Sequence, residues 1–530
     1  MKIKMKIKMM AGALLAALGL FASCSKSGKD VQDPNQEGST YVGITLSMGT
    51  NDLRAEDDNY NSKGTWNGKD EIKTIDVYVV DVASNVVSTG AYSKSNFTIT
   101  QTDGGNSISI IPTTAIRTTA GQKKVYAVIN ASAEVSQALS QANAANFENA
   151  YNDVAQEFAI ASLAMNDGTK DVIMASNAKE CTLTVLDGVT ADEALAPASP
   201  KNRAVVEMKR VVARVLVTTT AETYDVMYSD GVNKMGTVKK ISYAGAQGEK
   251  KFYIGQKVVG GFIKTPAYDY IPSTAQDIWG ATGKASYDYS DLKAHTFTTN
   301  PRMATKITGE LTAEQIGKEA LKQSLFMYEA SHKYQTNPNN TDPDFSKYDG
   351  GFRRGNTPYV LVRALFVPDA GAFADNTGAT YTEGKTFYLG ANNKFYSTKE
   401  NVTDPTKGGV AGQKFRTYVN GKVLYYAFVN PDRPLRTLDA PALRNNIYRI
   451  NIKGFKTIGT NWNPLYPEDP DNPAVPGTPE NPDPRPNDDP TDNPNPFNPE
   501  DPNTPKETWM SVEMSVLAWT VHTYDIELSL

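Results

Sequence analysis

The chain has 530 residues, which is long enough for two or three domains that each bury a core of their own. Its formal net charge of -5 and its pI near 5.5 exclude the strong positive field with which proteins bind nucleic acid. The 27 tyrosines, with abundant Gly, Thr, Asn and Val, are typical of extracellular β-rich proteins rather than cytosolic α/β enzymes. We therefore expect a mostly β fold and no nucleic-acid partner.

The first 24 residues have the features of a secretory signal. Lysines open the chain, and an apolar run from Ala11 to Phe21 follows, which is too short to span a bilayer as a finished helix. Residues 20–24 resemble a bacterial lipobox, in which the cysteine is acylated. We expect residues 1–23 to be a lipoprotein signal peptide, and Cys24 to carry acyl chains such as palmitate. At about 0.8 kcal/mol per buried methylene, these chains would hold the precursor in the outer membrane. The alternative is an ordinary signal peptide with a chance cysteine.

A strand with one buried face is predicted at 41–48, where apolar residues share one parity and small or polar residues share the other. The loop after it is polar and contains Arg54, the sole basic residue between Lys29 and Lys63. A protease that cuts between Arg54 and Ala55 would release residues 24–54 as a propeptide that includes this strand. A random surface arginine is the alternative. The apolar face of the strand consists of Val42, Ile44, Leu46 and Met48.

The body of the chain shows short strand patterns separated by Gly, Asn, Asp and Pro, as in antiparallel β-sandwiches. We expect two sandwich domains, at 55–203 and 204–462. Helical spacing predicts two insertions between strands, at 135–165 and 312–329. The expected strands are 72–82, 125–129, 181–186, 205–217, 358–367, 387–389, 423–429 and 447–452.

The composition changes abruptly at residue 463. Fifteen of the 30 prolines lie between 463 and 506, interleaved with Asp, Asn and Glu. Such a segment predicts an extended linker, with a reach of about 3.1 Å per residue. The final segment, 507–530, again alternates like a strand, and a strand alone is not stable in water, so it needs a sheet to join. Its apolar face consists of Met510, Val512, Met514 and Val516, and the expected donor segment continues through Trp519.

The two apolar faces, at 42–48 and 510–516, are similar. A sheet that loses the first strand would expose a groove into which the second strand of another molecule fits, as in donor-strand complementation of pilins. Four buried aliphatic side chains contribute at most about 6–12 kcal/mol to such a joint. Because an intact first strand competes at a high effective concentration, we expect polymerisation to require the cut after Arg54.

Residues for catalysis or cofactor binding are few. The three histidines, His295, His332 and His522, form no recognisable triad or zinc-spaced cluster, and no Gly-rich phosphate loop is present. Cys181 lies in an apolar strand pattern and is expected to be a small core residue. The oxygen-rich run 339–344 could bind Ca²⁺, but it lacks EF-hand spacing and a solvated loop is favoured. We expect no enzyme activity and no cofactor.

Seven segments together resemble one family, the shaft fimbrillins of Bacteroidales type V pili, of the minor, Mfa type. The resemblance implies two transthyretin-like β-sandwich domains and cleavage after Arg54 by a gingipain-type, arginine-specific protease. It also implies donor-strand exchange through residues 508–530. The segments are 22–26, 75–80, 124–130, 354–362, 425–431, 444–448 and 519–527.

The same resemblance implies the partners and the place of action. The partners would be further copies of the chain, accessory tip and anchor subunits, the protease and, before processing, the outer membrane. The mature subunit would lie in a surface fimbria that supports adhesion, co-aggregation, biofilm formation and virulence. The alternative is a tip adhesin or an anchor subunit that binds a host or bacterial ligand. Because a tip subunit need not donate a strand, the segment 508–530 favours the shaft.

Overall fold

A computed structural model describes most of the chain between residues 39 and 518. Within the described part, no helix is long and apolar enough to cross a membrane. For 510–518 the description covers the backbone alone. The described residues are 39–48, 71–102, 107–166, 171–198, 200–272, 285–309, 325–334, 349–429, 441–463, 465–466, 468–472, 478–482 and 510–518.

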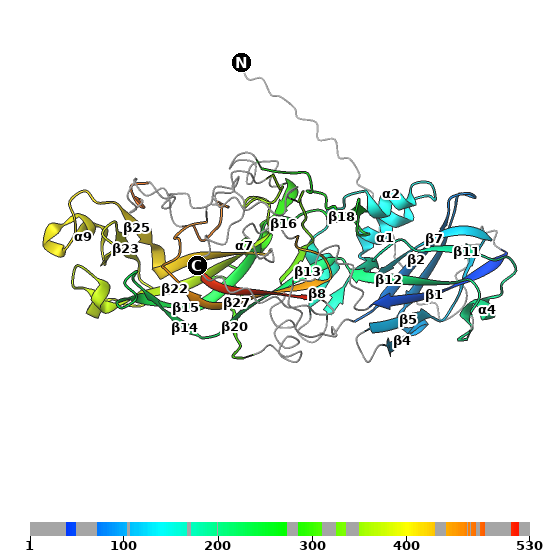
Figure 1. Cartoon of the computed structure of the whole chain (residues 1–530), viewed down its shortest axis with the longest axis horizontal. Coiled ribbons are helices and arrows are strands. Elements are labelled where there is room, and N and C mark those ends of the chain that lie inside the picture. The colour runs from blue at the N-terminus through cyan, green and yellow to red at the C-terminus, as the bar shows by residue number, and fades with distance from the viewer. Residues whose placement is uncertain are drawn as a thin grey trace, which may run out of the picture.

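The protein is mostly β, as the sequence predicts, and elongated (Figure 1). The N-terminal half of the chain forms one end of the molecule, and β23 (Phe387–Gly390), β25 (Phe415–Tyr418) and α9 (Lys399–Thr403) lie at the other. The transthyretin-like detail of the fold stays a prediction.

The N-terminal half is built on a ten-stranded sheet in the order β3-β2-β7-β10-β12-β1-β5-β4, with β11 beside β7 and β6 beside β1. Alternate residues of β1, β2, β7 and β12 meet in one hydrophobic core, so the sheet closes on itself as a sandwich. The strands are β1 (Thr40–Met48), β2 (Thr74–Asp81), β3 (Val86–Ser93), β4 (Phe97–Thr102), β5 (Ser107–Pro112), β6 (Ile116–Thr118), β7 (Gly121–Ile129), β10 (Ala175–Asn177), β11 (Thr182–Val185) and β12 (Arg203–Arg210).

Short helices fill the connections of this half. The helical insertion expected at 135–165 is three separate helices, because Asn143 and Asn146 hydrogen-bond to each other's backbone N–H and close a turn after the first. That first helix begins at Ser132, whose hydroxyl accepts from the Val135 N–H. The elements are α1 (Ala133–Ser140), α2 (Phe147–Asn152), α3 (Ile160–Leu163), the hairpin of β8 (Ala164–Asn166) and β9 (Asp171–Ile173), α4 (Ala191–Leu195) and the 3₁₀ turn η1 (Lys94–Asn96).

The C-terminal half packs two sheets face to face around the largest core. One sheet has the order β20-β13-β27-β28, with β21 also paired to β13, and the other has the order β14-β15-β22-β26. The bounds are β13 (Val212–Thr219), β20 (Thr305–Lys306), β21 (Leu325–Tyr328), β27 (Asn446–Phe455), β28 (Met510–Ala518), β14 (Thr223–Met227), β15 (Lys234–Ala246), β22 (Tyr359–Pro368) and β26 (Lys422–Phe428).

Tyr287, Tyr289 and Leu292 pack on the outer face of the second sheet, and further small elements complete this half. These small elements include a three-stranded sheet in the order β24-β23-β25 at the far end of the molecule (Figure 1). The elements are β16 (Gly248–Glu249), β17 (Val258–Val259), β18 (Phe262–Ile263), β19 (Tyr287–Asp288), α7 (Ser290–Ala294), η3 (Ala370–Ala372), η4 (Gly378–Thr380), β23 (Phe387–Gly390), β24 (Phe395–Tyr396), α9 (Lys399–Thr403), η5 (Pro405–Lys407), β25 (Phe415–Tyr418) and η6 (Val419–Gly421).

Two expectations from the sequence differ from the observed elements. The first sheet continues through β12, so the division expected between residues 203 and 204 falls at the start of a strand, and the second sheet begins at Val212. Residues 325–328, expected at the end of a helix, form β21 instead, because pairing with β13 outweighs helical spacing. The rest of that expected helix, 312–324, lies outside the described residues.

The start of the proline-rich segment is packed, so the prediction of an extended linker from residue 463 onward is wrong there. Leu465 and Tyr466 are buried, and the Tyr466 ring stacks on Tyr289 with 4.4 Å between ring centroids. Asp469 accepts from the buried Arg363 at 3.0 Å. Burial is favourable because these aspartate and aromatic side chains find partners in the C-terminal half. Residues 483–506 lie outside the described part.

The two halves share a core rather than touching at a flexible joint. Aromatic and aliphatic residues of β2, β7, α1, α2 and α3 pack with residues of β13, β21 and β27 in one cluster. Asp171 of the first half and Arg214 of the second form an ion pair with 2.6 Å between Oδ2 and Nη2, and both side chains are fully buried. The Tyr328 hydroxyl donates to the Phe158 carbonyl across the same junction.

Candidate assembly site

The first strand of the described chain is inserted between two others. β1 pairs in parallel with β12 over Gly43 to Ser47, and antiparallel with β5 over Leu46 to Met48. Its first three residues pair with β6. Figure 1 shows β1 between β12 and β5. Because both of its edges are paired, removing β1 would leave a strand-shaped gap, which we call the β1 slot.

The apolar face of β1 points into the N-terminal core. Val42, Ile44 and Leu46 are at most 1% exposed, and Met48 is 8% exposed. All four belong to the same cluster as residues of β2, β7 and β12. On the other face, Tyr41, Thr45 and Ser47 are half-buried. The β1 slot therefore selects for alternating apolar side chains.

Thr40 anchors the beginning of β1. It is fully buried, and its hydroxyl donates to the Leu186 carbonyl at 2.7 Å. The same oxygen accepts from the Val189 N–H at 3.1 Å and from Asn202 Nδ2 at 3.2 Å. A side chain without a hydroxyl at this position would leave buried donors without their acceptor, which typically costs about 1–3 kcal/mol.

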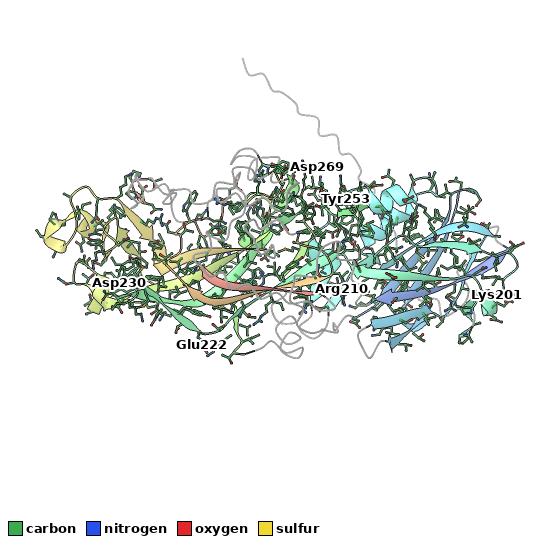
Figure 2. All side chains as sticks on the ribbon, in the orientation of Figure 1. Lys201, Arg210, Glu222, Asp230, Tyr253 and Asp269 are labelled. Carbon is green, nitrogen blue, oxygen red and sulfur yellow. The ribbon has the colours of Figure 1, made fainter. Side chains whose placement is uncertain are left out.

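The polar face of β1 is covered at Gly43 by α4. A Cβ atom at position 43 would lie 2.2 Å from the Ala194 carbonyl oxygen, which is too close for any side chain without movement of α4. The helix is held by a capping box in which Thr190 and Glu193 hydrogen-bond to each other's backbone N–H. Glu193 also pairs with Lys201, which Figure 2 labels at the outer end of the N-terminal half.

Arg203 lies beside this covered position. Its Nε and Nη2 donate to the Ala194 carbonyl at 3.1 and 2.7 Å, and its Nη1 donates to the Thr45 hydroxyl at 3.2 Å. Partial burial lowers the pKa of Arg203. Among the ion pairs of the described residues, none includes Arg203. The guanidinium thus carries its charge next to β1 with neutral oxygen partners.

The C-terminal strand is docked on its own chain. β28 runs antiparallel to β27 as the last strand of its sheet, with a register shift between Ile452 and Gly454. Figure 1 shows this strand lying along β27. In the register, Val512, Met514 and Val516 stand opposite Ile452, Ile450 and Tyr448. The strand predicted at the C-terminus therefore has a sheet within the monomer.

Several residues singled out from the sequence lie outside the described part: Cys24, Arg54, Ala55, Trp519, His522 and the run 339–344. For Met510, Val512, Met514 and Val516 only the backbone is described. The structure thus brings the displaced-strand residues together in the β1 slot, and it places the donor-strand backbone elsewhere, on β27.

The remaining candidates for chemistry have structural surroundings. Cys181 is partly buried, and its burial raises the thiol pKa to about 11, so it is not a reactive thiolate. His332 is buried and hydrogen-bonds to the Asn356 carbonyl, whereas His295 lies beside Asp291 and the Asn300 carbonyl at the surface. In the described residues, no group of three or more His, Cys, Asp or Glu side chains could hold a metal ion.

Sequence reasoning missed Thr40, Gly43 and Arg203. A glycine inside a strong strand pattern signals close approach of another backbone, and it was the available sign at position 43. Nothing local in the sequence marks Arg203 or the hydroxyl of Thr40, because their partners are 9 to 162 residues away in the chain.

Comparison with known proteins identifies the family. Residues 416–525 match the model of the C-terminal part of fimbrillin, the major fimbrial subunit protein type IV. Two Mfa1 minor fimbrium subunits from Porphyromonas gingivalis are each 34% identical to this chain over 544 aligned positions, which cover 99% of this chain and 100% of the relative. The chain belongs to the Mfa1 family of minor fimbrium subunits.

Family membership confirms the resemblance predicted from the sequence and decides the broad role. The Mfa1-type chain is a structural subunit of a cell-surface fimbria and not an enzyme. Among solved structures, a candidate cell adhesion protein from Parabacteroides distasonis superposes with a TM-score of 0.38 and 10% identity, covering 90% of this chain and 97% of that one. The P. gingivalis tip protein Mfa3 superposes with a TM-score of 0.31 and 11% identity, covering 78% of this chain and 95% of that one. Superpositions with such scores add nothing about function.

Proposed function

We propose that this chain is the shaft subunit of its fimbria and polymerises by donor-strand exchange. The precursor is a lipoprotein acylated at Cys24 and held in the outer membrane. An arginine-specific protease cuts it between Arg54 and Ala55, which frees β1 to leave. The C-terminal segment 508–530 of another copy then fills the β1 slot. Tip and anchor subunits, like the Mfa3 and Mfa2 proteins of P. gingivalis, would end the polymer.

The observation that carries the proposal is the burial of β1 between β12 and β5. A strand with both edges paired and four buried apolar side chains cannot leave without exposing a groove of its own shape. The four side chains contribute at most about 6–12 kcal/mol, and each ladder hydrogen bond adds about 0.5–1.5 kcal/mol. That free energy is sufficient for a durable joint between subunits.

Exchange also requires β28 to leave β27. In the monomer, docking on β27 covers the donor segment and gives it no free edge on that side. Release of β28 exposes the edge of β27, while the released strand fills the β1 slot of the next subunit. The exchange is therefore a competition between two docking places for one strand. Cleavage shifts this competition by removing the tethered occupant of the slot.

The first test compares three versions of the protein. Full-length precursor should remain monomeric, precursor cut after Arg54 should polymerise, and cut protein lacking 508–530 should remain a folded monomer. Size-exclusion chromatography and electron microscopy measure assembly, circular dichroism measures folding, and mass spectrometry of assembled fimbriae should find Ala55 at the N-terminus. Polymers of normal length from the truncated protein would overturn donor-strand exchange.

A matched pair of point variants tests the donor face. Val512→Asp places a charge on the apolar parity of the segment and should reduce polymer yield by about tenfold or more, because a charge resists burial. Ser515→Asp, on the other parity, should reduce it little. Equal effects of the two would refute the assigned face.

A further inference from the structure

The donor segment repeats β1 over nine consecutive positions. Residues 508–516 read Thr-Trp-Met-Ser-Val-Glu-Met-Ser-Val, and β1, Thr40–Met48, reads Thr-Tyr-Val-Gly-Ile-Thr-Leu-Ser-Met. Threonine matches threonine, aromatic matches aromatic, each apolar residue matches an apolar one, and a serine takes the place of the glycine. The similarity runs in the same chain direction.

The opposite direction fits less well. A reversed strand that keeps all four apolar side chains in place would put Ala518 at the position of Thr40 and Leu517 at that of Tyr41. Alanine has no hydroxyl, so the hydrogen bonds that Thr40 makes with Leu186, Val189 and Asn202 would be lost. In the same direction, Thr508 can replace each of them.

The covered position also restricts the register. A shift of the donor strand by two residues keeps its apolar side chains on the same face. In one direction the shift places Glu513 at the position of Gly43, and in the other direction it moves an apolar residue out of the slot. Glu513 is far too large for a position where even a Cβ atom would lie 2.2 Å from the Ala194 carbonyl oxygen. The unshifted register places Ser511 there, which is among the smallest side chains and requires the least movement of α4.

The unshifted register brings a carboxylate to Arg203. Glu513 takes the position of Thr45, whose hydroxyl accepts from Arg203 Nη1 at 3.2 Å. The guanidinium is partly desolvated, and its other contacts are to the Ala194 carbonyl. A carboxylate in place of the hydroxyl would turn a hydrogen bond to a neutral oxygen into a charge-assisted pair.

We infer that the donor strand enters the β1 slot in the direction and register of β1 itself, with Thr508 at the position of Thr40 and Glu513 paired with Arg203 of the accepting molecule. This rests on the proposed donor-strand function and deepens it. The precursor has threonine at position 45, so the ion pair exists only in the assembled fimbria. It favours the incoming strand over the strand that cleavage removes.

Cross-linking tests direction and register, in a Cys181→Ala background that removes the cysteine of the folded region. Ser47 pairs with Glu207 in the observed register, so Ser515 should lie opposite Glu207 in the fimbria. Polymers carrying Ser515→Cys and Glu207→Cys should link into covalent ladders with a short reagent that carries two maleimide groups, each of which adds one cysteine thiol. The matched pair Ser511→Cys and Glu207→Cys should not link.

Each result of the cross-linking has a consequence. Ladders from the Ser511 pair instead would show a reversed strand and overturn the inference. Absence of both ladders in fimbriae that still require 508–530 would show that the strand docks elsewhere, which also overturns it. Fimbriae that form without 508–530 would refute the proposed function itself, so the two failures are distinguishable.

A charge exchange tests the ion pair. Glu513→Arg should slow polymerisation of cut protein about tenfold, and Arg203→Glu should do the same. The double variant should recover to within about threefold of the unmodified protein, since the pair is restored with reversed sign. Independent, additive losses would overturn the pairing. Thermal unfolding of the Arg203→Glu precursor checks that its loss reflects assembly and not misfolding of α4.

Discussion

Gly43 shows how one residue can restrict a whole strand. Its backbone lies so close to α4 that an added Cβ atom would meet the Ala194 carbonyl oxygen at 2.2 Å and Arg203 Nε at 2.8 Å. The other positions of the same β1 face, Tyr41, Thr45 and Ser47, are half-buried and carry side chains. The close approach is local to position 43.

We expect Gly43→Val to destabilise the precursor by about 1–3 kcal/mol, the usual cost of overpacking a buried position. Ser47→Val, on the same face of β1, should change the free energy of unfolding by less than about 0.5 kcal/mol. Urea unfolding of both variants measures the difference. If the two variants were equally stable, α4 would not restrict the β1 slot.

His332 makes the stability of the C-terminal half depend on pH. Burial lowers the pKa of His332 to about 4, whereas an unfolded histidine has a pKa of about 6.5. As the pH falls from about 6.5 towards 4, the unfolded chain gains a proton that the folded chain does not, so the folded state loses up to about 3 kcal/mol. Above about pH 6.5 His332 is neutral in both the folded and the unfolded chain, so the folded state loses no stability through it.

The variant His332→Gln should flatten the fall in stability between pH 6.5 and pH 4, as measured by urea unfolding at several pH values. Glu249 is the internal reference, since burial raises its pKa to about 8 and it lowers stability as the pH rises from about 4.5 to 8. Its contribution should be the same in both proteins. If stability fell as steeply between pH 6.5 and pH 4 in His332→Gln as in the unmodified protein, His332 would not be the cause of that fall.

At the scale of elements, the sequence predicts best where one periodicity has no competitor. The alternation of Val42, Ile44, Leu46 and Met48 matches their burial residue by residue. Prediction from periodicity fails at 325–328, where the spacing is helical but pairing with β13 makes the segment a strand. The proline-rich segment misleads for a different reason, because its aspartates are favourable in the interior only beside Arg363 and Lys422, which are far away in sequence.

The same limit applies to the candidate site. Its apolar half follows from local alternation, but the Thr40 hydrogen bonds, the cover over Gly43 and the charge of Arg203 depend on α4 and its flanking loops. These loops reach β1 only through the tertiary fold. Within β1, Gly43 is a sign of the close approach, whereas no local pattern indicates the Thr40 hydrogen bonds or the charge of Arg203.

The packed start of the proline-rich segment can be separated from the remainder by mutation. Arg363 is fully buried between Asp469 and Asp471, so Asp469→Ala leaves its charge only partly compensated and should cost about 3 kcal/mol or more of stability. Asp489→Ala, in the part that we still expect to be an extended linker, should have no measurable effect. Thermal unfolding compares them, and equal melting temperatures would contradict a structural role for 463–472.

For the molecule as a whole, the proposed shaft role requires that load pass from one end to the other. Each subunit would be held through its β1 slot in the N-terminal half and through its own C-terminal strand, which leaves from the other half. The junction must therefore resist separation. The shared hydrophobic cluster and the buried pair of Asp171 with Arg214 are suited to that requirement.

We expect the unmodified protein to unfold in one cooperative transition, and Asp171→Ala to separate it into two. The variant leaves the buried Arg214 charge without its carboxylate, at a cost of about 3–5 kcal/mol. Lys257→Ala is the control, because its pair with Asp153 also links the halves but is solvent-exposed and should contribute less than about 1 kcal/mol. Calorimetry distinguishes one transition from two. A single transition in Asp171→Ala, shifted no further than in Lys257→Ala, would mean that the apolar cluster alone couples the halves and that the buried charges serve another purpose.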